Sequence, residues 1–100
     1  MYKPLPDSLT IKTSKVNGLG VFVKEVIPQA TNLGMTHLEL GKLILRTPLG
    51  GFINHSDEPN CQRSQVRIRP GFDRWSIITL EDIEEGEELT LKYKLYVPEK

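Results

Sequence analysis

The side chains best suited to chemistry in this sequence lie in one polar run, N-H-S-D-E-P-N at residues 54–60. The run follows two apolar residues, Phe52 and Ile53. Its histidine and its two asparagines carry hydrogen-bonding groups that could hold a polar ligand. Asn, Asp, Ser and Pro also favour turns, so the run taken alone fits a strand end followed by a loop without chemistry. Whether it forms a ligand site depends on what the rest of the chain places beside it.

Two other stretches carry residues that a binding site would need. Residues 17–20 read N-G-L-G, and Gly18 and Gly20 allow a positive φ or a close approach of the backbone to another group. Residues 86–93 read G-E-E-L-T-L-K-Y, which indicates a strand that ends in the aromatic residue Tyr93. A hairpin turn without a ligand and an ordinary strand tyrosine explain these two stretches when each is taken alone.

The bulk composition limits the class of protein. One hundred residues make a single domain, residues 1–100, with a small core. Thirteen basic and thirteen acidic side chains cancel, so we expect no direct nucleic-acid binding. The first residues do not resemble a signal peptide and no apolar run approaches about eighteen residues, so we expect a soluble intracellular protein without membrane contact. Cys61 is the single cysteine, which excludes an intrachain disulfide and a multi-cysteine zinc cluster, and we expect no metal site.

Hydrophobic alternation and turn residues predict a chain made mostly of strands. The expected strands are residues 9–14, 21–24, 37–46, 61–69, 75–80 and 89–93. The expected loops are residues 15–20, 47–51 and 70–73. Residues 29–36 show no clear period. Many short strands joined by Gly and Pro turns, with hardly a helix, indicate a compact all-β domain.

One strand carries a stripe of arginines. Arg63, Arg67 and Arg69 alternate with Val66 and Ile68 and therefore fall on one face of the strand over residues 61–69. Because the total charge is neutral, the stripe is better explained as a solvated strand face than as a nucleic-acid site.

Three blocks of the sequence, in this order, resemble the SET domain of protein-lysine methyltransferases. They are G-L-G-V-F at residues 18–22, F-I-N-H-S-D-E-P-N at residues 52–60, and I-E-E-G-E-E-L-T-L-K-Y at residues 83–93. The resemblance runs from about residue 9 to residue 96. It implies a mainly β fold, the SET-type β-clip of small curled sheets, with a knot-like C-terminal segment that brings the second and third blocks to one site.

The resemblance also implies an activity, the transfer of a methyl group from S-adenosyl-L-methionine to a lysine of a protein or peptide substrate. The implied cofactor-binding residues are Gly18, Leu19, Gly20, Phe52, Asn54 and His55. His55 would act largely through its main chain, while its ring could equally stabilise the loop. Tyr93 is the implied catalytic residue, because a tyrosine hydroxyl can orient the lysine amine for in-line displacement. The implied substrate channel contains Leu91 and Tyr96.

Several positions depart from the family pattern. Gly51 stands where most members have Arg, Asp57 where they have Cys, and Lys92 where an acidic residue is frequent. Leu91 replaces a usual Phe or Tyr, which leaves room in the channel and favours the addition of more than one methyl group. The insert between Ile27 and Phe52 is nearly absent, as is the cysteine-rich segment that often follows the domain and binds zinc. One hypothesis is a homodimer in which a second copy completes the shortened groove.

Three readings therefore stay open. The first is an active protein-lysine N-methyltransferase. The second is a SET-like module that has lost catalysis and serves in binding or structure. The third is an unrelated small β domain that binds carbohydrate or a protein. Cofactor binding separates the first reading from the third, and turnover separates it from the second.

Overall fold

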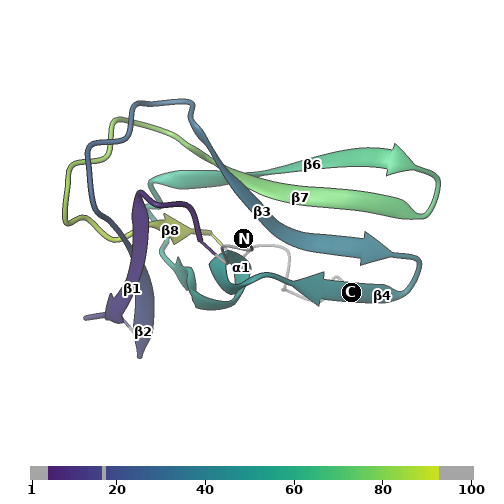
Figure 1. The fold of residues 1–100 in the computed structure, drawn as a ribbon, viewed down its shortest axis with the longest axis horizontal. Helices are drawn as coiled ribbons and strands as arrows, with labels where there is room; N and C mark the ends of the chain where they lie inside the picture. Colours follow the sequence, from purple (N-terminus) through teal and green to yellow (C-terminus); the bar gives the residue numbers. More distant parts are fainter. Residues whose placement is uncertain (1–4, 17, 93–100) are drawn as a thin grey trace.

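The computed structural model describes residues 5–16 and 18–92, which form short strands and one short helix (Figure 1). The elements are β1 (Leu9–Thr13), β2 (Leu19–Val23), β3 (Asn32–Leu40), β4 (Leu43–Arg46), α1 (Pro48–Phe52), β5 (Asn54–His55), β6 (Cys61–Arg69), β7 (Phe72–Thr79) and β8 (Thr90–Leu91). The mainly β class expected from the sequence is confirmed.

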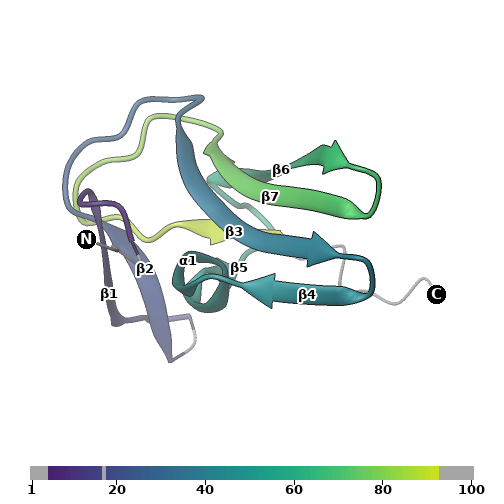
Figure 2. The same ribbon diagram turned by 45° about the vertical axis from the view of Figure 1, so that its right-hand side comes forward.

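The strands form three small sheets (Figure 2). An antiparallel four-stranded sheet has the order β4-β3-β7-β6, and β1 pairs with β2 in an antiparallel hairpin. The third sheet is a parallel pair of β5 and β8, in which Asn54 lies opposite Thr90. The polar run and the third sequence block are thus side by side, although much of the chain separates them.

The hydrophobic core lies where these sheets meet. Val21, Ile77, Ile83 and Leu89 have no exposed surface, and they come from β2, β7 and the segment that leads into β8. Complete burial of one such aliphatic side chain stabilises a fold by about 1.5–3 kcal/mol relative to exposure. The core therefore ties the β1–β2 hairpin to the C-terminal part of the described chain.

Two connecting segments, residues 24–31 and 80–89, run side by side in both ribbon views (Figures 1 and 2). Ile27 and Ile83 exchange backbone hydrogen bonds, 2.9 Å from Ile27 N to Ile83 O and 2.8 Å in the other direction. The Leu89 N–H then donates to the Val21 carbonyl at 2.8 Å. These hydrogen bonds hold residues 80–89 alongside β2, so that β8 lies next to β5.

The single strand expected over residues 37–46 is wrong in one respect, because the chain reverses inside it. β3 begins earlier, at Asn32, and ends at Leu40, and β4 returns antiparallel to it from Leu43. Gly41 in the turn has a φ of 61°, a left-handed conformation that glycine adopts without strain. The glycine that interrupts the apolar pattern therefore marks a hairpin and not a weak point in one strand.

The loop expected over residues 47–51 is also wrong, because residues 48–52 form helix α1. The Thr47 hydroxyl accepts a hydrogen bond from the Gly50 N–H at 3.2 Å, and Pro48 occupies the first turn, where its missing N–H costs nothing. Two glycines in five residues hid this helix from propensity arguments. No helix in the described part of the chain is long and apolar enough to cross a membrane.

The last expected strand, over residues 89–93, does not close the main sheet. Its described part is β8, Thr90–Leu91, and it joins the separate parallel pair with β5. The arginine stripe is broken as well, because a bulge between Arg67 and Arg69 shifts the register opposite β7. The knot-like passage expected of the C-terminal segment depends on residues 93–100, which lie outside the described residues.

Candidate functional site

The centre of the candidate site is Gly20, the second residue of β2. It pairs with Lys12 across the β1–β2 hairpin, and its backbone is buried. A Cβ at this position would overlap the Glu88 carboxylate, lying 2.9 Å from its Cδ, and would lie 3.0 Å from the Asn54 amide nitrogen. Glycine therefore allows close approach of polar groups here, although the residue lies in a strand and not in the turn that the sequence predicted over residues 15–20.

Asn54 joins the three sequence blocks. Its amide nitrogen donates to the Leu19 carbonyl at 3.1 Å and to a Glu88 carboxylate oxygen at 2.8 Å. Asn54 belongs to β5, Leu19 begins β2, and Glu88 precedes β8. One side chain thus connects three segments that the sequence keeps far apart, which is what the resemblance implied for the second and third blocks.

Glu88 is a site residue that the sequence reasoning did not single out. The Ser14 hydroxyl lies 2.8 and 2.9 Å from its two carboxylate oxygens, and it donates to this group from the end of β1. A backbone bridge between Phe22 and Glu88 fixes the position of the side chain. Six acidic residues occur within residues 81–88, and nothing in their spacing distinguishes the last one. Only the fold shows that Glu88 points to Gly20.

Asn60 was also missed, and it holds β8 in place. Its amide nitrogen donates to the Glu88 carbonyl at 2.9 Å, and its amide oxygen accepts from the Thr90 N–H at 2.9 Å. Its own N–H donates to the Thr90 hydroxyl at 3.2 Å. Asn60, the second asparagine of the polar run, therefore holds the backbone of Glu88 and Thr90 on either side of Leu89.

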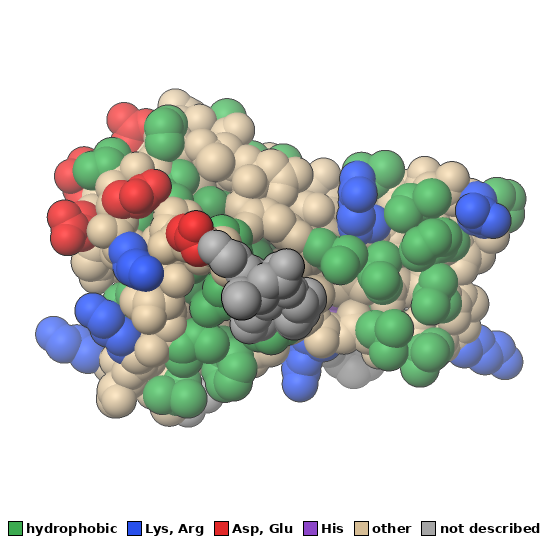
Figure 3. All heavy atoms as spheres, in the orientation of Figure 1, with side chains coloured by type: hydrophobic (Ala, Val, Ile, Leu, Met, Phe, Trp, Pro, Cys, Tyr) green, Lys and Arg blue, Asp and Glu red, His purple; other side chains and the backbone are tan. Residues whose placement is uncertain are grey.

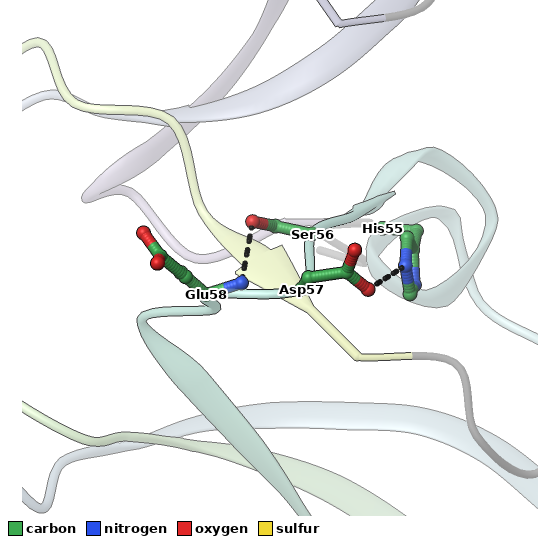
Figure 4. Close-up of polar contacts among 4 residues, drawn as sticks. All are labelled: His55, Ser56, Asp57 and Glu58. Atoms are coloured by element: carbon green, nitrogen blue, oxygen red, sulfur yellow. Dashed lines mark hydrogen bonds and ion pairs between the residues drawn. The ribbon is translucent and has the colours of Figure 1, made fainter.

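The polar run itself is a tight turn (Figure 4). The His55 Nε2 lies 3.1 Å from the Asp57 Oδ1, with the imidazole about half exposed, and the Glu58 N–H donates to the Ser56 hydroxyl at 3.0 Å. The main chain of the run is bound to β8, because the Ser56 N–H donates to the Leu91 carbonyl at 3.1 Å. Asp57, one of the departures from the family pattern, thus contacts the His55 ring directly.

The other expected site residues, which are the channel residues Leu91 and Tyr96, the cofactor residue Phe52 and the catalytic Tyr93, are divided between described and undescribed parts of the chain. Leu91 is buried, with 6% of its surface exposed, while Phe52 is 38% exposed at the end of α1. Tyr93 and Tyr96 lie outside the described residues. A groove of about 420 Å³ passes over Leu91 and is lined by both apolar and cationic side chains. Its lining residues are Pro59, Cys61, Gln62, Arg63, Leu80, Leu91 and Lys92.

The ionisable groups of the described part are mostly at the surface. Burial raises the pKa of the Cys61 thiol to about 12, with a smaller contribution from the Glu81 charge, so this thiol is inert near neutral pH. Within the described residues, no group of three or more His, Cys, Asp and Glu side chains is arranged to hold a metal ion.

Known proteins support the assignment of the fold and of the family. The sequence model of the SET domain family matches residues 30–94. Histone-lysine N-methyltransferase ash1 of Drosophila melanogaster is 40% identical over 60 residues, which are 57% of this chain and 3% of that protein. A histone-lysine N-methyltransferase of Emericella nidulans, specific for lysine 4 of histone H3, is 45% identical over 49 residues, or 49% of this chain and 4% of that protein.

The fold agrees with a solved structure. A candidate histone methyltransferase of Plasmodium falciparum superposes with a TM-score of 0.73 over 89% of this chain and 95% of that one, at 21% sequence identity. Since the family model covers well over half of the residues, this chain belongs to the SET domain family. It spans only a few per cent of the length of the curated relatives that it matches.

Proposed function

We propose that this chain is a protein-lysine N-methyltransferase that uses S-adenosyl-L-methionine. The observation that carries the proposal is the polar cluster around Gly20, where Asn54, Glu88 and the Leu19 carbonyl meet. Membership of the SET family and the methyltransferase names of the relatives support the same activity. The proposal treats the chain as a single domain over residues 1–100.

The residues at Gly20 fit one end of the cofactor. S-adenosyl-L-methionine carries an ammonium and a carboxylate at its amino-acid end, and when bound it supplies the methyl group as part of a sulfonium. An ammonium needs acceptors, which the Glu88 carboxylate and the Leu19 carbonyl provide. The missing Cβ at Gly20 lets the Glu88 carboxylate lie directly against the β2 backbone. Gly18 would shape the turn before Leu19, and Phe52 and the main chain of His55 would contact the rest of the cofactor.

The lysine side of the reaction would use the channel residues. A free lysine amine has a pKa of about 10.4, so it must lose a proton before its nitrogen can attack. The buried, apolar Leu91 would help by disfavouring the ammonium form. Tyr93 would orient the neutral amine, and Tyr96 would complete the channel. Since Leu91 has no hydroxyl to hold a water, we propose that the enzyme adds more than one methyl group.

The proposed substrate class is a lysine in a protein or peptide. The relatives are named as histone-lysine methyltransferases, but they are far longer than this chain. Histones are therefore substrates to test, and the relatives' substrate is not assigned to this chain. A second copy that completes the shortened groove remains part of the proposal, and sedimentation of the active species tests it.

The first test is isothermal titration calorimetry with S-adenosyl-L-methionine and S-adenosylhomocysteine. We expect micromolar binding of the cofactor. Asn54→Ala should weaken it at least about tenfold, because the variant loses the amide that holds the Leu19 carbonyl and the Glu88 carboxylate in position. Asn32→Ala is a matched control, since that amide accepts from the Gly34 N–H in β3, away from the cluster. Absence of binding by the folded protein at millimolar ligand would contradict the proposal.

Turnover is tested separately with histones and other lysine-rich proteins as substrates. We expect Tyr93→Phe to lower kcat by at least about a hundredfold while cofactor binding is unchanged, because the hydroxyl acts only on the amine. An equal kcat in both proteins would remove the catalytic role of Tyr93.

A second candidate function is a SET-like binding module without catalysis. The observation in its favour is that Glu88 is already satisfied by Ser14 and Asn54 within the chain, so the cluster is complete without a ligand. Gly51, in place of the usual Arg, points the same way. Cofactor binding without turnover on any substrate would favour this function.

A further inference from the structure

One face of the four-stranded sheet carries an exposed group of apolar side chains, which we name the apolar sheet face. Its members are the half-buried Phe72 and five exposed residues, Leu40, Leu43, Leu45, Val66 and Ile68. The register places Leu43 and Phe72 on either side of Leu40, and residues two apart in a strand share a face. Figure 3 shows hydrophobic side chains gathered over these four strands at one end of the molecule.

The exposure of this face is large for aliphatic residues. Leu43 is 55% exposed, Val66 47% and Leu45 46%. Single exposed leucines are common on soluble proteins, but contiguous apolar patches mark interaction sites. A sheet face of this kind is normally covered by a second layer of helix or sheet. In the described residues, β4 is exposed along its whole length.

Among the residues that the structure describes, the charged positions on and beside the apolar sheet face are positive. Arg74 lies on the face opposite Val66, Arg69 lies opposite Phe72, and Lys42 is in the turn between β3 and β4. The carboxylates at this end of the sheet belong to the other face, because Glu39 pairs in register with Asp73.

The register of β6 confirms that separation. Asp73 lies opposite Arg67 and accepts from its Nε at 3.0 Å and from the Gln65 amide at 2.7 Å. Its carboxylate is therefore held on the far side of the sheet by neighbours on that side. The apolar sheet face thus combines aliphatic side chains with Lys and Arg, and lacks a carboxylate among its own strand positions.

We propose that the apolar sheet face docks a protein partner that presents an apolar surface flanked by carboxylates. Charge complementarity selects this partner, since cations at a rim are satisfied by opposing Asp or Glu and disfavour like charge. A second copy paired through the same face would bring cations against cations. A nucleic acid offers no aliphatic surface for these side chains. A flat sheet face is covered in proteins by a second layer of helix or sheet, which favours a protein partner, and the vesicle experiment below distinguishes a bilayer from it. The partner can be a substrate protein or a recruiting protein, and the surface is separate from the Gly20 cluster.

The test uses the full 100-residue chain and two synthetic amphipathic helical peptides. Both peptides carry a leucine stripe, one flanked by glutamates and the other by lysines. Fluorescence anisotropy measures binding, and amide chemical shifts locate it. We expect the acidic peptide to bind at least tenfold more tightly than the basic one, with shifts confined to β3, β4, β6 and β7, and with an affinity that falls as salt rises.

Variants identify the surface. Leu45→Thr combined with Val66→Thr should weaken the acidic peptide at least tenfold, and Thr retains strand propensity. Val16→Thr combined with Val26→Thr is the matched control, because those valines are 58% and 57% exposed elsewhere, and it should change the affinity less than twofold. Arg69→Glu should reduce the preference for the acidic peptide, because the net charge of the three cationic positions falls from +3 to +1. This variant keeps the test valid if the double variant does not fold.

Four results would overturn the proposal. In the peptide experiment, these are equal binding of both peptides and no binding of either peptide at 1 mM, which is roughly the limit of a useful contact. The third result is a dimer that Leu45→Thr dissociates, and the fourth is co-sedimentation with phosphatidylserine vesicles that the acidic peptide does not prevent. The third result would assign the face to a second copy, and the fourth would assign it to a membrane surface.

Discussion

At the scale of single residues, the site depends on the absence of a Cβ atom at Gly20. Gly20 lets the Glu88 carboxylate and the Asn54 amide approach the β2 backbone, and a methyl group there would occupy the same space. The neighbouring atoms belong to groups that are already hydrogen-bonded to each other at 2.8 Å, so they can move only by giving up that bond.

We therefore expect Gly20→Ala to abolish measurable cofactor binding and to lower the free energy of unfolding by about 1–3 kcal/mol. Calorimetry and urea denaturation measure the two effects. Gly41→Ala is the control, since Gly41 also sits in a β-hairpin, has a φ of 61° and has open space around its Cβ position. It should cost about 1 kcal/mol through backbone strain alone and leave binding unchanged. Normal binding in Gly20→Ala would separate this glycine from the site.

His37 gives the fold a predictable sensitivity to acid. Burial lowers the pKa of its imidazole, and the charges of Arg46 and Arg63 lower it further. The ring packs against Trp75, with centroids 5.4 Å apart. The unfolded chain therefore binds a proton on His37 near pH 6.5, whereas the folded chain binds it only at a lower pH. The contribution of neutral His37 to the free energy of unfolding is fully present above about pH 6.5 and is lost as the pH decreases below it.

We expect His37→Gln to reduce that loss. The urea midpoint of the natural chain should fall between pH 7 and pH 5 by more than that of the variant, even if the variant is less stable at pH 7. Parallel pH profiles of the two proteins would show that another group causes the acid sensitivity.

The family motifs in the sequence pointed to Asn54, Gly18 and Gly20 as cofactor-binding residues. The structure brings Asn54 and Gly20 together with Glu88, while a Cβ at Gly18 would have open space around it. Glu88, Ser14 and Asn60 were missed because their importance comes from pairings across the fold, which neither residue type nor spacing reports. The roles of Asn54, His55 and the two tyrosines stay predictions until binding and turnover are measured.

At the scale of elements, α1 shows how two adjacent glycines can have opposite requirements. A Cβ on Gly50 would overlap the Thr36 carbonyl oxygen and lie 3.0 Å from the Thr36 Cβ, both parts of a buried residue of β3. A Cβ on Gly51 would meet only the Arg46 side chain, at 3.7 Å, which is an ordinary contact. The helix lies against β3 through one glycine, and the other faces outward.

We expect Gly50→Ala to destabilise the protein by about 3 kcal/mol through overpacking. Gly51→Ala should stabilise it by about 0.5–1 kcal/mol, because alanine has the higher helix propensity. Thermal and urea denaturation of the two variants measure the difference. Equal stability of the pair would mean that α1 does not pack closely on Thr36.

The same element explains the limits of secondary-structure prediction in this chain. Alternation of apolar and polar residue types found β1 and β6, although the apolar side chains of β6 beyond Cys61 are exposed, and it found most of β7, which carries buried residues. It failed at α1, where a threonine cap and tertiary packing outweigh the low propensity of glycine. It also failed to divide residues 37–46, since an exposed apolar strand such as β4 has no polar face to show its reversal.

At the scale of the whole molecule, the reactivity of the Cys61 thiol measures how often β6 separates from the strands packed around it. Cys61 is 1% exposed and its pKa is raised by burial to about 12. In the folded protein at pH 8, we expect its reaction with Ellman's reagent to be slower than that of a free cysteine by about 1000-fold, because both access and thiolate fraction are low.

Urea should accelerate the reaction in step with the unfolded fraction. The denatured chain, which should react within seconds with one thiol per molecule, gives the reference rate. Rapid stoichiometric reaction of the native protein would mean that β6 separates from its neighbours far below the global unfolding transition.

The parallel pairing of Asn54 with Thr90 also determines when the protein can become functional during synthesis. A ribosome has made β1 to β7 before it reaches Leu89, and both hairpins and the four-stranded sheet can form from that nascent chain. β5 still lacks its partner, and Gly20 still lacks Glu88. The site can therefore form only after Glu88 and β8 have been synthesised, and pairing between segments so far apart in the sequence is intrinsically slow. A chain that stops before residue 88 would lack Glu88, β8 and the buried Leu89, and would have no site.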